Sequence, residues 1–182
     1  GNGESVCRVQ SRPTDPVATV DDPRYLSSTM TVPSLHPRIR EHAAQITAGA
    51  TGDSARIEKL VGWIQANIRR EAVDVFSALD VLDGKKAECQ GHAYLYAAFA
   101  RSLNIPTRVV NGLVYMEEAQ GFLYHSWNES LVDGRWRPVD PTFGQVVADA
   151  THVKLVEGES IADLTPLLDM IGRVKARVIS YE

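Results

Sequence analysis

The sequence predicts an α+β domain in which helices come first and the strands of an antiparallel sheet follow. Apolar residues recur at helical spacing in the first half of the chain. The clearest stripe consists of Ile57, Leu60, Val61, Ile64 and Ile68. After residue 106 the chain changes to segments rich in β-branched and aromatic residues, which are typical of strands. Two of these segments are separated by Asp133-Gly134, a two-residue signal for a β-hairpin.

Proline and polar residues dominate the start of the chain, so we expect residues 1–33 to form an extended arm or linker. Pro13, Pro16, Pro23 and Pro33 lie there among Ser, Thr and Asp, with little apolar periodicity. We assign residues 34–182 to one folded domain. Because the chain starts at Gly1 rather than Met, we expect a processed or trimmed fragment. The absence of a signal peptide then says nothing about the compartment.

Helix and strand signals alternate with clear breaks along the folded part. We expect helices at 37–47, from about 53 to 68, at 77–82 and at 89–104. Pro37 suits the first turn of the first helix, Thr51 or Asp53 can cap the second, and Pro106 disfavours continuation of the fourth. We expect strands at 107–115, 122–132, 135–139 and 153–156, then a helix at 161–170 and a last strand at 174–180.

Composition narrows the class of protein. A hydrophobic content of 44% and a charged content of 23% are ordinary for a globular protein with a real core. A net charge of −4 argues against a nucleic-acid-binding surface, and no run approaches the roughly 20 apolar residues of a membrane span. Two cysteines cannot make a disulfide scaffold. We interpret Cys7, in the polar arm, as an incidental thiol or the partner of a segment outside this sequence.

The hairpin register predicts which side chains share a face of the sheet. If Asp133-Gly134 forms a two-residue loop, Val132 pairs with Arg135 and Glu129 with Pro138, at a site where the missing N–H of proline costs no ladder bond. Asp140 then becomes the diagonal neighbour of His125. Diagonal neighbours lie roughly 7–8 Å apart, which a carboxylate and an imidazole can bridge. A slip of one residue would turn the two to opposite faces.

Cys89, His125 and Asp140 are therefore candidates for a catalytic triad. Cys89 begins an apolar helix, where the helix dipole and an imidazolium would favour its nucleophilic thiolate. His125 would act as general base and then as acid, while Asp140 would fix its tautomer. Backbone N–H groups around Cys89 are the natural oxyanion donors. This chemistry predicts a cysteine-dependent acyl-transfer enzyme.

Each candidate also has a simpler interpretation. A lone cysteine in a buried helix is usually structural, and Asp140 before a proline could only start a turn. Glu129 shares the face of His125 and ranks second as the orienting acid. His92 would complete a Cys-x-x-His pair, but no second ligand pair accompanies it, so we interpret it as a packing residue rather than a metal ligand.

Four further residues are candidates for the cleft around the triad. Glu88 and Gln90 flank the thiol, and Tyr124 and Trp127 flank the imidazole, although Trp127 could equally belong to the core. His152 and Asp149 follow the sheet and are interpreted as structural. The chain lacks the spacing of a calcium loop.

Five blocks of this sequence resemble the core of the transglutaminase-like superfamily, and most of all bacterial transglutaminase-like cysteine proteases, a branch of the papain-like group. They are residues 78–82, 89–93, 100–108, 125–129 and 136–142. The resemblance covers about residues 35–155, and the stretch 143–152 is similar to a tail of the bacterial members. Many members carry Gly-Asp before the cysteine, where this chain has Ala87-Glu88.

The resemblance implies a papain-like fold, with the helix of Cys89 packed on an antiparallel sheet, and a Cys89–His125–Asp140 triad. It also implies a thioester intermediate with a peptide or protein amide, no cofactor, and a bacterial, extracytoplasmic location. We expect hydrolysis rather than transfer to an amine. The main alternative is a non-catalytic module that keeps the cleft for protein binding. A third is acyl transfer from a small-molecule thioester, as in arylamine acyltransferases.

Overall fold

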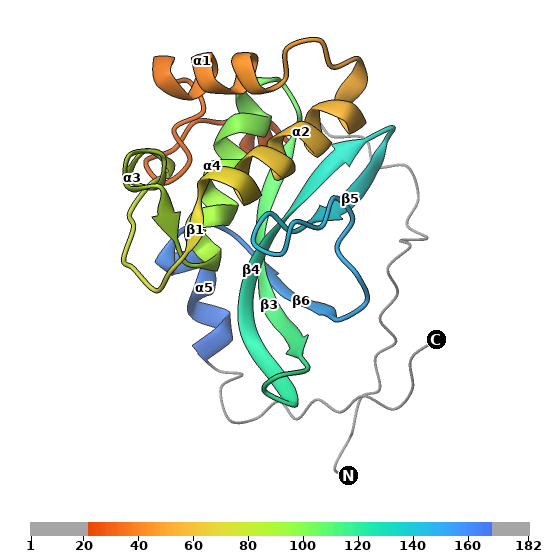
Figure 1. Cartoon of the computed structure of the whole chain (residues 1–182). Coiled ribbons are helices and arrows are strands. Elements are labelled where there is room, and N and C mark those ends of the chain that lie inside the picture. Colours follow the sequence, from red (N-terminus) through yellow and green to blue (C-terminus); the bar gives the residue numbers. More distant parts are fainter. Residues whose placement is uncertain (1–21, 169–182) are drawn as a thin grey trace.

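The computed structural model describes residues 22–168 and confirms the α+β class. Its long strands are β3 (Thr107–Met116), β4 (Gly121–Val132), β5 (Arg135–Val139) and β6 (His152–Glu157). They form one antiparallel sheet of order β5-β4-β3-β6. The helices gather on one side of this sheet, and β3 and β4 extend beyond them (Figure 1).

The helices begin and end close to where the sequence predicts. They are α1 (Pro37–Ile46), α2 (Gly52–Asn67), α3 (Ala78–Gly84), α4 (Cys89–Ser102) and α5 (Ile161–Leu168). Pro37 lies in the first turn of α1, as expected. Ser77 and Asp80 form a capping box that fixes the start of α3.

The predicted hairpin register is confirmed. Val132 pairs with Arg135 and Glu129 with Pro138. Asp133 and Gly134 both have positive φ, at 52° and 73°, as a type I′ turn requires. β5 pairs with β4 only from Asn128 onward, so the preceding part of β4 has a free edge on that side.

Helix α4 is the centre of the core. Its residues from Gly91 to Arg101 are all buried, and it contacts α1, α2, α3 and the strands β3 and β4. Asn128 donates to the carbonyl of Ala93, and Ser130 bonds the hydroxyl of Tyr96, so alternate residues of β4 face this helix. The residues between them, including His125, therefore lie on the other face.

A small parallel sheet was not predicted. It joins β1 (Arg69–Arg70) to β2 (Lys86–Ala87), directly before the start of α4. Each strand has two residues, too few for a periodic pattern. The pairing brings the end of α2 beside the chain that enters α4, and so helps to fix the position of Cys89.

Part of the segment expected to be an arm lies against the domain. Residues Pro23–Leu26 form a short 3₁₀ helix, η1, and Tyr25 packs edge-on against Trp136 with ring centroids 4.8 Å apart. Val32 is fully buried in the core. Cys7 and the strand predicted at 174–180 lie outside the described residues, as do the last two residues of the helix predicted at 161–170. Within residues 22–168 no helix is long and apolar enough to cross a membrane.

Candidate active site

Cys89 is the first residue of α4, and Glu88 caps that helix. One Glu88 carboxylate oxygen accepts from the N–H of Gly91 at 3.3 Å. The other accepts from the Cys89 thiol at 3.4 Å. Glu88 therefore has two contacts, one with the helix end and one with the sulfur.

The chain comes very close to itself at this turn, and Gly91 makes that possible. A methyl group at position 91 would lie 2.6 Å from the Cβ of Ala87 and 2.7 Å from a methyl of Val75. The methyl group of Ala87 fills this space instead. The start of α4 is thus fixed by packing as well as by its cap.

The Cys89 thiol is neutral at rest. Burial, the neighbouring Glu88 carboxylate and its hydrogen bond raise the pKa of Cys89 to about 11, although the backbone N–H groups of Ser126 and Gln90 act in the opposite direction. We expected the helix dipole and an imidazolium to favour the thiolate, whereas burial and the Glu88 carboxylate favour the neutral thiol. The N–H of Ser126 reaches the sulfur on the free edge of β4.

His125 and Asp140 meet as the register predicts. His125 Nε2 lies 2.8 Å from Asp140 Oδ2, and both side chains are buried. The imidazole is stacked between Phe143 at 4.7 Å and Trp127 at 6.2 Å, measured between ring centroids, with interplanar angles of 14° and 16°. These rings restrict rotation of the imidazole, so its orientation is set on three sides.

Asp140 is held in a tight loop. Its Oδ1 accepts from the backbone N–H groups of Thr142 at 2.7 Å and Phe143 at 3.2 Å. Burial alone would raise the pKa of Asp140, but hydrogen bonds from His125 and His152 outweigh burial and hold the pKa well below its ordinary range. Asp140 is therefore ionised and can only accept hydrogen bonds.

A second histidine shares this carboxylate. His152, the first residue of β6, places Nε2 at 3.0 Å from Asp140 Oδ2 and Nδ1 at 3.2 Å from Asp149 Oδ1. The residue is buried. Sequence reasoning interpreted His152 and Asp149 as structural residues; only the position of His152 in the family-like tail hinted at more.

A hollow of about 420 Å³ exposes the thiol and the imidazole together. Cys89, His125, Glu88 and Tyr124 line it, along with Arg70, Glu71 and Ala72. Asp140 lies behind His125 and is fully buried. In the described part of the chain, no hydrogen bond joins the Cys89 sulfur to the imidazole. His125 Nδ1 is the ring nitrogen not engaged with Asp140.

The structure places the four candidate cleft residues in different surroundings. Glu88 and Tyr124 line the hollow, and Tyr124 is about half exposed. Gln90 turns its amide toward the hydroxyl of Tyr94. Trp127 is 2% exposed and lies against His125 and His152 inside the fold. Only the first two thus border the open space.

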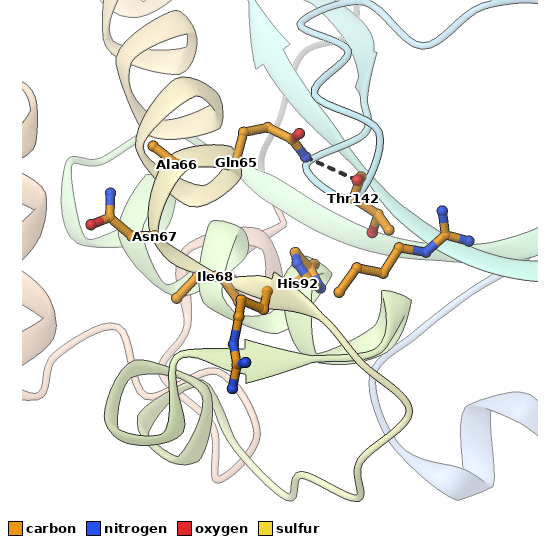
Figure 2. Close-up of a pocket in the computed structure, with 8 residues that line it drawn as sticks. Gln65, Ala66, Asn67, Ile68, His92 and Thr142 are labelled. Carbon is orange, nitrogen blue, oxygen red and sulfur yellow. Dashed lines mark hydrogen bonds between the residues drawn. The ribbon is translucent and has the colours of Figure 1, made fainter.

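A second hollow of about 320 Å³ lies next to the first, and Arg70 lines both. Figure 2 shows Gln65 at the end of α2 reaching Thr142 across this space, above His92. The Gln65 amide donates to the carbonyls of Pro141 and Thr142 at 2.8 and 2.9 Å. Helix α2 thereby holds the loop that contains Asp140.

The alternatives from the sequence have other partners in the structure. Glu129 bonds Arg108 at 2.6 Å and Lys154 at 2.8 Å, so its charge is satisfied away from His125. His92 Nδ1 lies 2.9 Å from the carbonyl of Glu88 and supports the turn into α4. Phe143 and Arg70 were not among the predicted site residues, because both act through stacking between distant segments. The Arg70 guanidinium lies 4.9 Å from the Phe143 ring centroid.

Comparison with known families settles the broad assignment. Residues 40–141, more than half of the chain, match the model of the transglutaminase-like superfamily. The chain belongs to the transglutaminase-like superfamily. The match includes Cys89, His125 and Asp140 but ends before His152.

Curated relatives of this transglutaminase-like chain include the kyphoscoliosis peptidases of Mus musculus and Homo sapiens. The mouse protein is 26% identical over 134 residues, which cover 64% of this chain and 20% of the mouse protein. The human protein is 25% identical over 132 residues, covering 63% and 19%. The chain thus spans about one fifth of the length of these relatives.

Solved structures share the transglutaminase-like fold. A Cytophaga hutchinsonii protein provisionally described as a cysteine protease aligns with a TM-score of 0.69 at 22% identity, over 84% of this chain and 52% of that chain. The periplasmic domain of TgpA from Pseudomonas aeruginosa aligns with a TM-score of 0.51 at 23% identity, over 68% and 48%. These likenesses establish the fold.

Proposed function

We propose that this protein is a cysteine-dependent acyl-transfer enzyme that forms a thioester between Cys89 and an acyl group of a peptide or protein amide. The proposal depends on the arrangement of the Cys89, His125 and Asp140 side chains. Cys89 and His125 line the same hollow, and His125 is bonded at 2.8 Å to a buried, ionised Asp140. Two relatives named peptidases agree with an amide substrate.

The proposed reaction uses the two ring nitrogens of His125 differently. Nε2–H donates to Asp140, which leaves Nδ1 with the free lone pair of the ring. Because the thiol is neutral at rest, Nδ1 removes its proton as the sulfur attacks the amide carbonyl. The imidazolium then gives that proton to the departing amine. A thioester remains on Cys89.

Release of the acyl group reverses these proton transfers. His125 takes a proton from an incoming water or amine, the new bond forms at the thioester carbonyl, and the thiol regains a proton. We propose that water is the preferred acceptor. The hollow around Cys89 is lined by charged side chains such as Arg70 and Glu71, which are exposed or partly exposed and favour access of water over a dry amine channel.

A glutamine-containing peptide offered together with a labelled primary amine tests both points. We expect ammonia release to exceed amine incorporation, and both to vanish in Cys89→Ala. Efficient incorporation would refute the preference for water. An active Cys89→Ala protein would refute the role of the thiol.

One observation favours a second candidate, a binding module that keeps the fold without catalysis. Burial and the carboxylate of Glu88 hold the Cys89 thiol neutral, which is unusual for an activated cysteine. A binding module predicts that peptides bind equally to the natural protein and to Cys89→Ala, and that no acyl group ever reaches the sulfur. Isothermal titration with a non-cleaved peptide, together with intact-protein mass measurement, separates the two candidates.

An extracytoplasmic location is part of the proposal. It is supported by the likeness to the periplasmic domain of TgpA. Localisation of the full-length protein by cell fractionation tests it, and recovery in the cytoplasm would refute it.

A further inference from the structure

His152 has an environment that determines its protonation. Its Nε2 faces Asp140 Oδ2 at 3.0 Å. Its Nδ1 lies 3.2 Å from both the backbone carbonyl and the Oδ1 of Asp149, and 3.3 Å from Thr151 Oγ1. The Thr151 hydroxyl donates its own proton to Asp149. A carbonyl and an ionised carboxylate can only accept, so the partners of both ring nitrogens favour a proton on each.

The buried ring thus lies between two carboxylates that favour its imidazolium form. Burial alone would lower the pKa of His152, but Asp140 and Asp149 outweigh burial and raise it. The other groups against this ring are Trp127, Phe143 and His125, of which only His125 can become charged. Further along β6, Lys154 is already paired with Glu129 and Glu157.

This charge bears on His125 in two ways. Both imidazoles bond the same oxygen, Asp140 Oδ2, at 2.8 and 3.0 Å. Their ring centroids are 5.7 Å apart. An imidazolium at His152 therefore neutralises part of the Asp140 charge and would repel a second cation beside it.

We propose that His152 is a positioning residue of the Cys89–His125–Asp140 site, whose fixed positive charge keeps His125 neutral and ready to accept the thiol proton. The proposal rests on the proposed function. It fits the contact between Glu88 and Cys89, because a neutral thiol needs a base rather than an imidazolium partner. The resting site is then a thiol and a neutral imidazole, and charge separation occurs only during attack.

Substitution by glutamine tests the charge while keeping a donor. In His152→Gln the amide can still donate to Asp140 but carries no charge. We expect the acidic limb of kcat/KM to move about one pH unit higher, because His125 then takes up its second proton more readily. Asp149→Asn removes one of the two carboxylates and should move the limb in the same direction by less, which covers the case in which His152→Gln does not fold. His42→Gln, on the half-exposed face of α1, is the matched control and should leave the limb in place.

Nitrogen NMR of histidine-labelled protein separates this proposal from the proposed function, since it needs no turnover. The chain has five histidines, and loss of signals in His152→Gln assigns those of His152. We expect both ring nitrogens of His152 to stay protonated at pH 7. A His152 with one bare nitrogen at pH 7, or unchanged titration of His125 in His152→Gln, would overturn the proposal. Absence of any amide turnover would sink the proposed function and leave the NMR result standing.

Discussion

The carboxylate of Glu88 should control the reactivity of Cys89, and Glu88→Gln tests this directly. The Glu88 oxygen lies 3.4 Å from the Cys89 sulfur, and ionisation of the thiol would place two negative charges side by side. Glutamine keeps an oxygen that can accept from the N–H of Gly91, so the cap of α4 is retained. The substitution removes a charge and little else.

The expected size follows from the distance. Two unit charges about 4 Å apart interact by about 1 kcal/mol in water and about 4 kcal/mol at an effective dielectric constant of 20. Because Cys89 is only partly exposed, we take about 2 kcal/mol, which corresponds to a fall of about one and a half units in the pKa of Cys89. The thiolate fraction at pH 8 would rise about 30-fold, and its lower intrinsic nucleophilicity reduces the gain in alkylation rate to about sevenfold.

The assay is alkylation of Cys89 by iodoacetamide across pH, followed by intact-protein mass, in protein that carries Cys7→Ser so that a single thiol reacts. Glu71→Gln is the matched control. Glu71 lines the same hollow, but Lys86 lies 2.7 Å from its carboxylate and balances its charge. We expect the Glu71 variant to titrate like the parent.

Two results would refute the reasoning. One is a change of less than about half a unit in the pKa of Cys89 in Glu88→Gln, since that would mean that solvent already screens the charge. The other is an equal change in Glu71→Gln, since the effect would then be a general property of the hollow and not of the 3.4 Å contact.

Three further predictions follow from the packing of the site. Asp140→Asn should lower kcat by about 10⁴-fold, which steady-state kinetics would measure. Because it breaks buried ion pairs, it should also reduce the free energy of unfolding by about 3 kcal/mol, which urea unfolding would measure. The pKa of Asp140 lies below its ordinary range in the folded state, so its stabilisation should be present above about pH 4 and be lost as the pH falls further. If the melting temperature of Asp140→Asn fell with acid as steeply as that of the parent, this prediction would be contradicted. Gly91→Ala should lower the free energy of unfolding by about 2 kcal/mol, because its methyl group would overlap Ala87. Gly62→Ala, in open space on α2, should raise it by up to about 1 kcal/mol. Equal effects of the two substitutions in thermal unfolding would refute the packing argument.

The sequence predicts the His125–Asp140 pair because a hairpin turn transmits its register along two strands. Asp133-Gly134 adopts the two positive φ angles that a type I′ turn needs, and every later pair follows from it. The helices are predicted for a similar reason. Their apolar stripes and their proline, glycine and serine boundaries are local in the chain.

The place of His152 could not be predicted from local signals. β6 returns to β3 across a non-local pairing that shifts register between Asn111 and Gly112. A Cβ at Gly112 would lie 2.1 Å from the carbonyl of Val153, so a close backbone approach that no pattern reveals sets the position of the strand. Without that register, His152 cannot be placed against Asp140.

The state of the thiol was also beyond the sequence. Helix position alone favours a thiolate, whereas the outcome depends on where the Glu88 carboxylate points and on how deeply the sulfur is buried. The burial of Val32 could not be predicted either. Val32 is surrounded by prolines and polar residues, so no periodic apolar pattern marks it as a core residue.

The most direct test of the account is the mass of the Cys89-containing peptide from protein quenched in acid during turnover of an amide substrate. At early times we expect the mass of that peptide to be increased by the mass of the acyl group. The increase should disappear as substrate is consumed. Steady turnover with an unmodified Cys89 peptide, or the same adduct in Cys89→Ala protein, would contradict the assignment of this sulfur as the nucleophile.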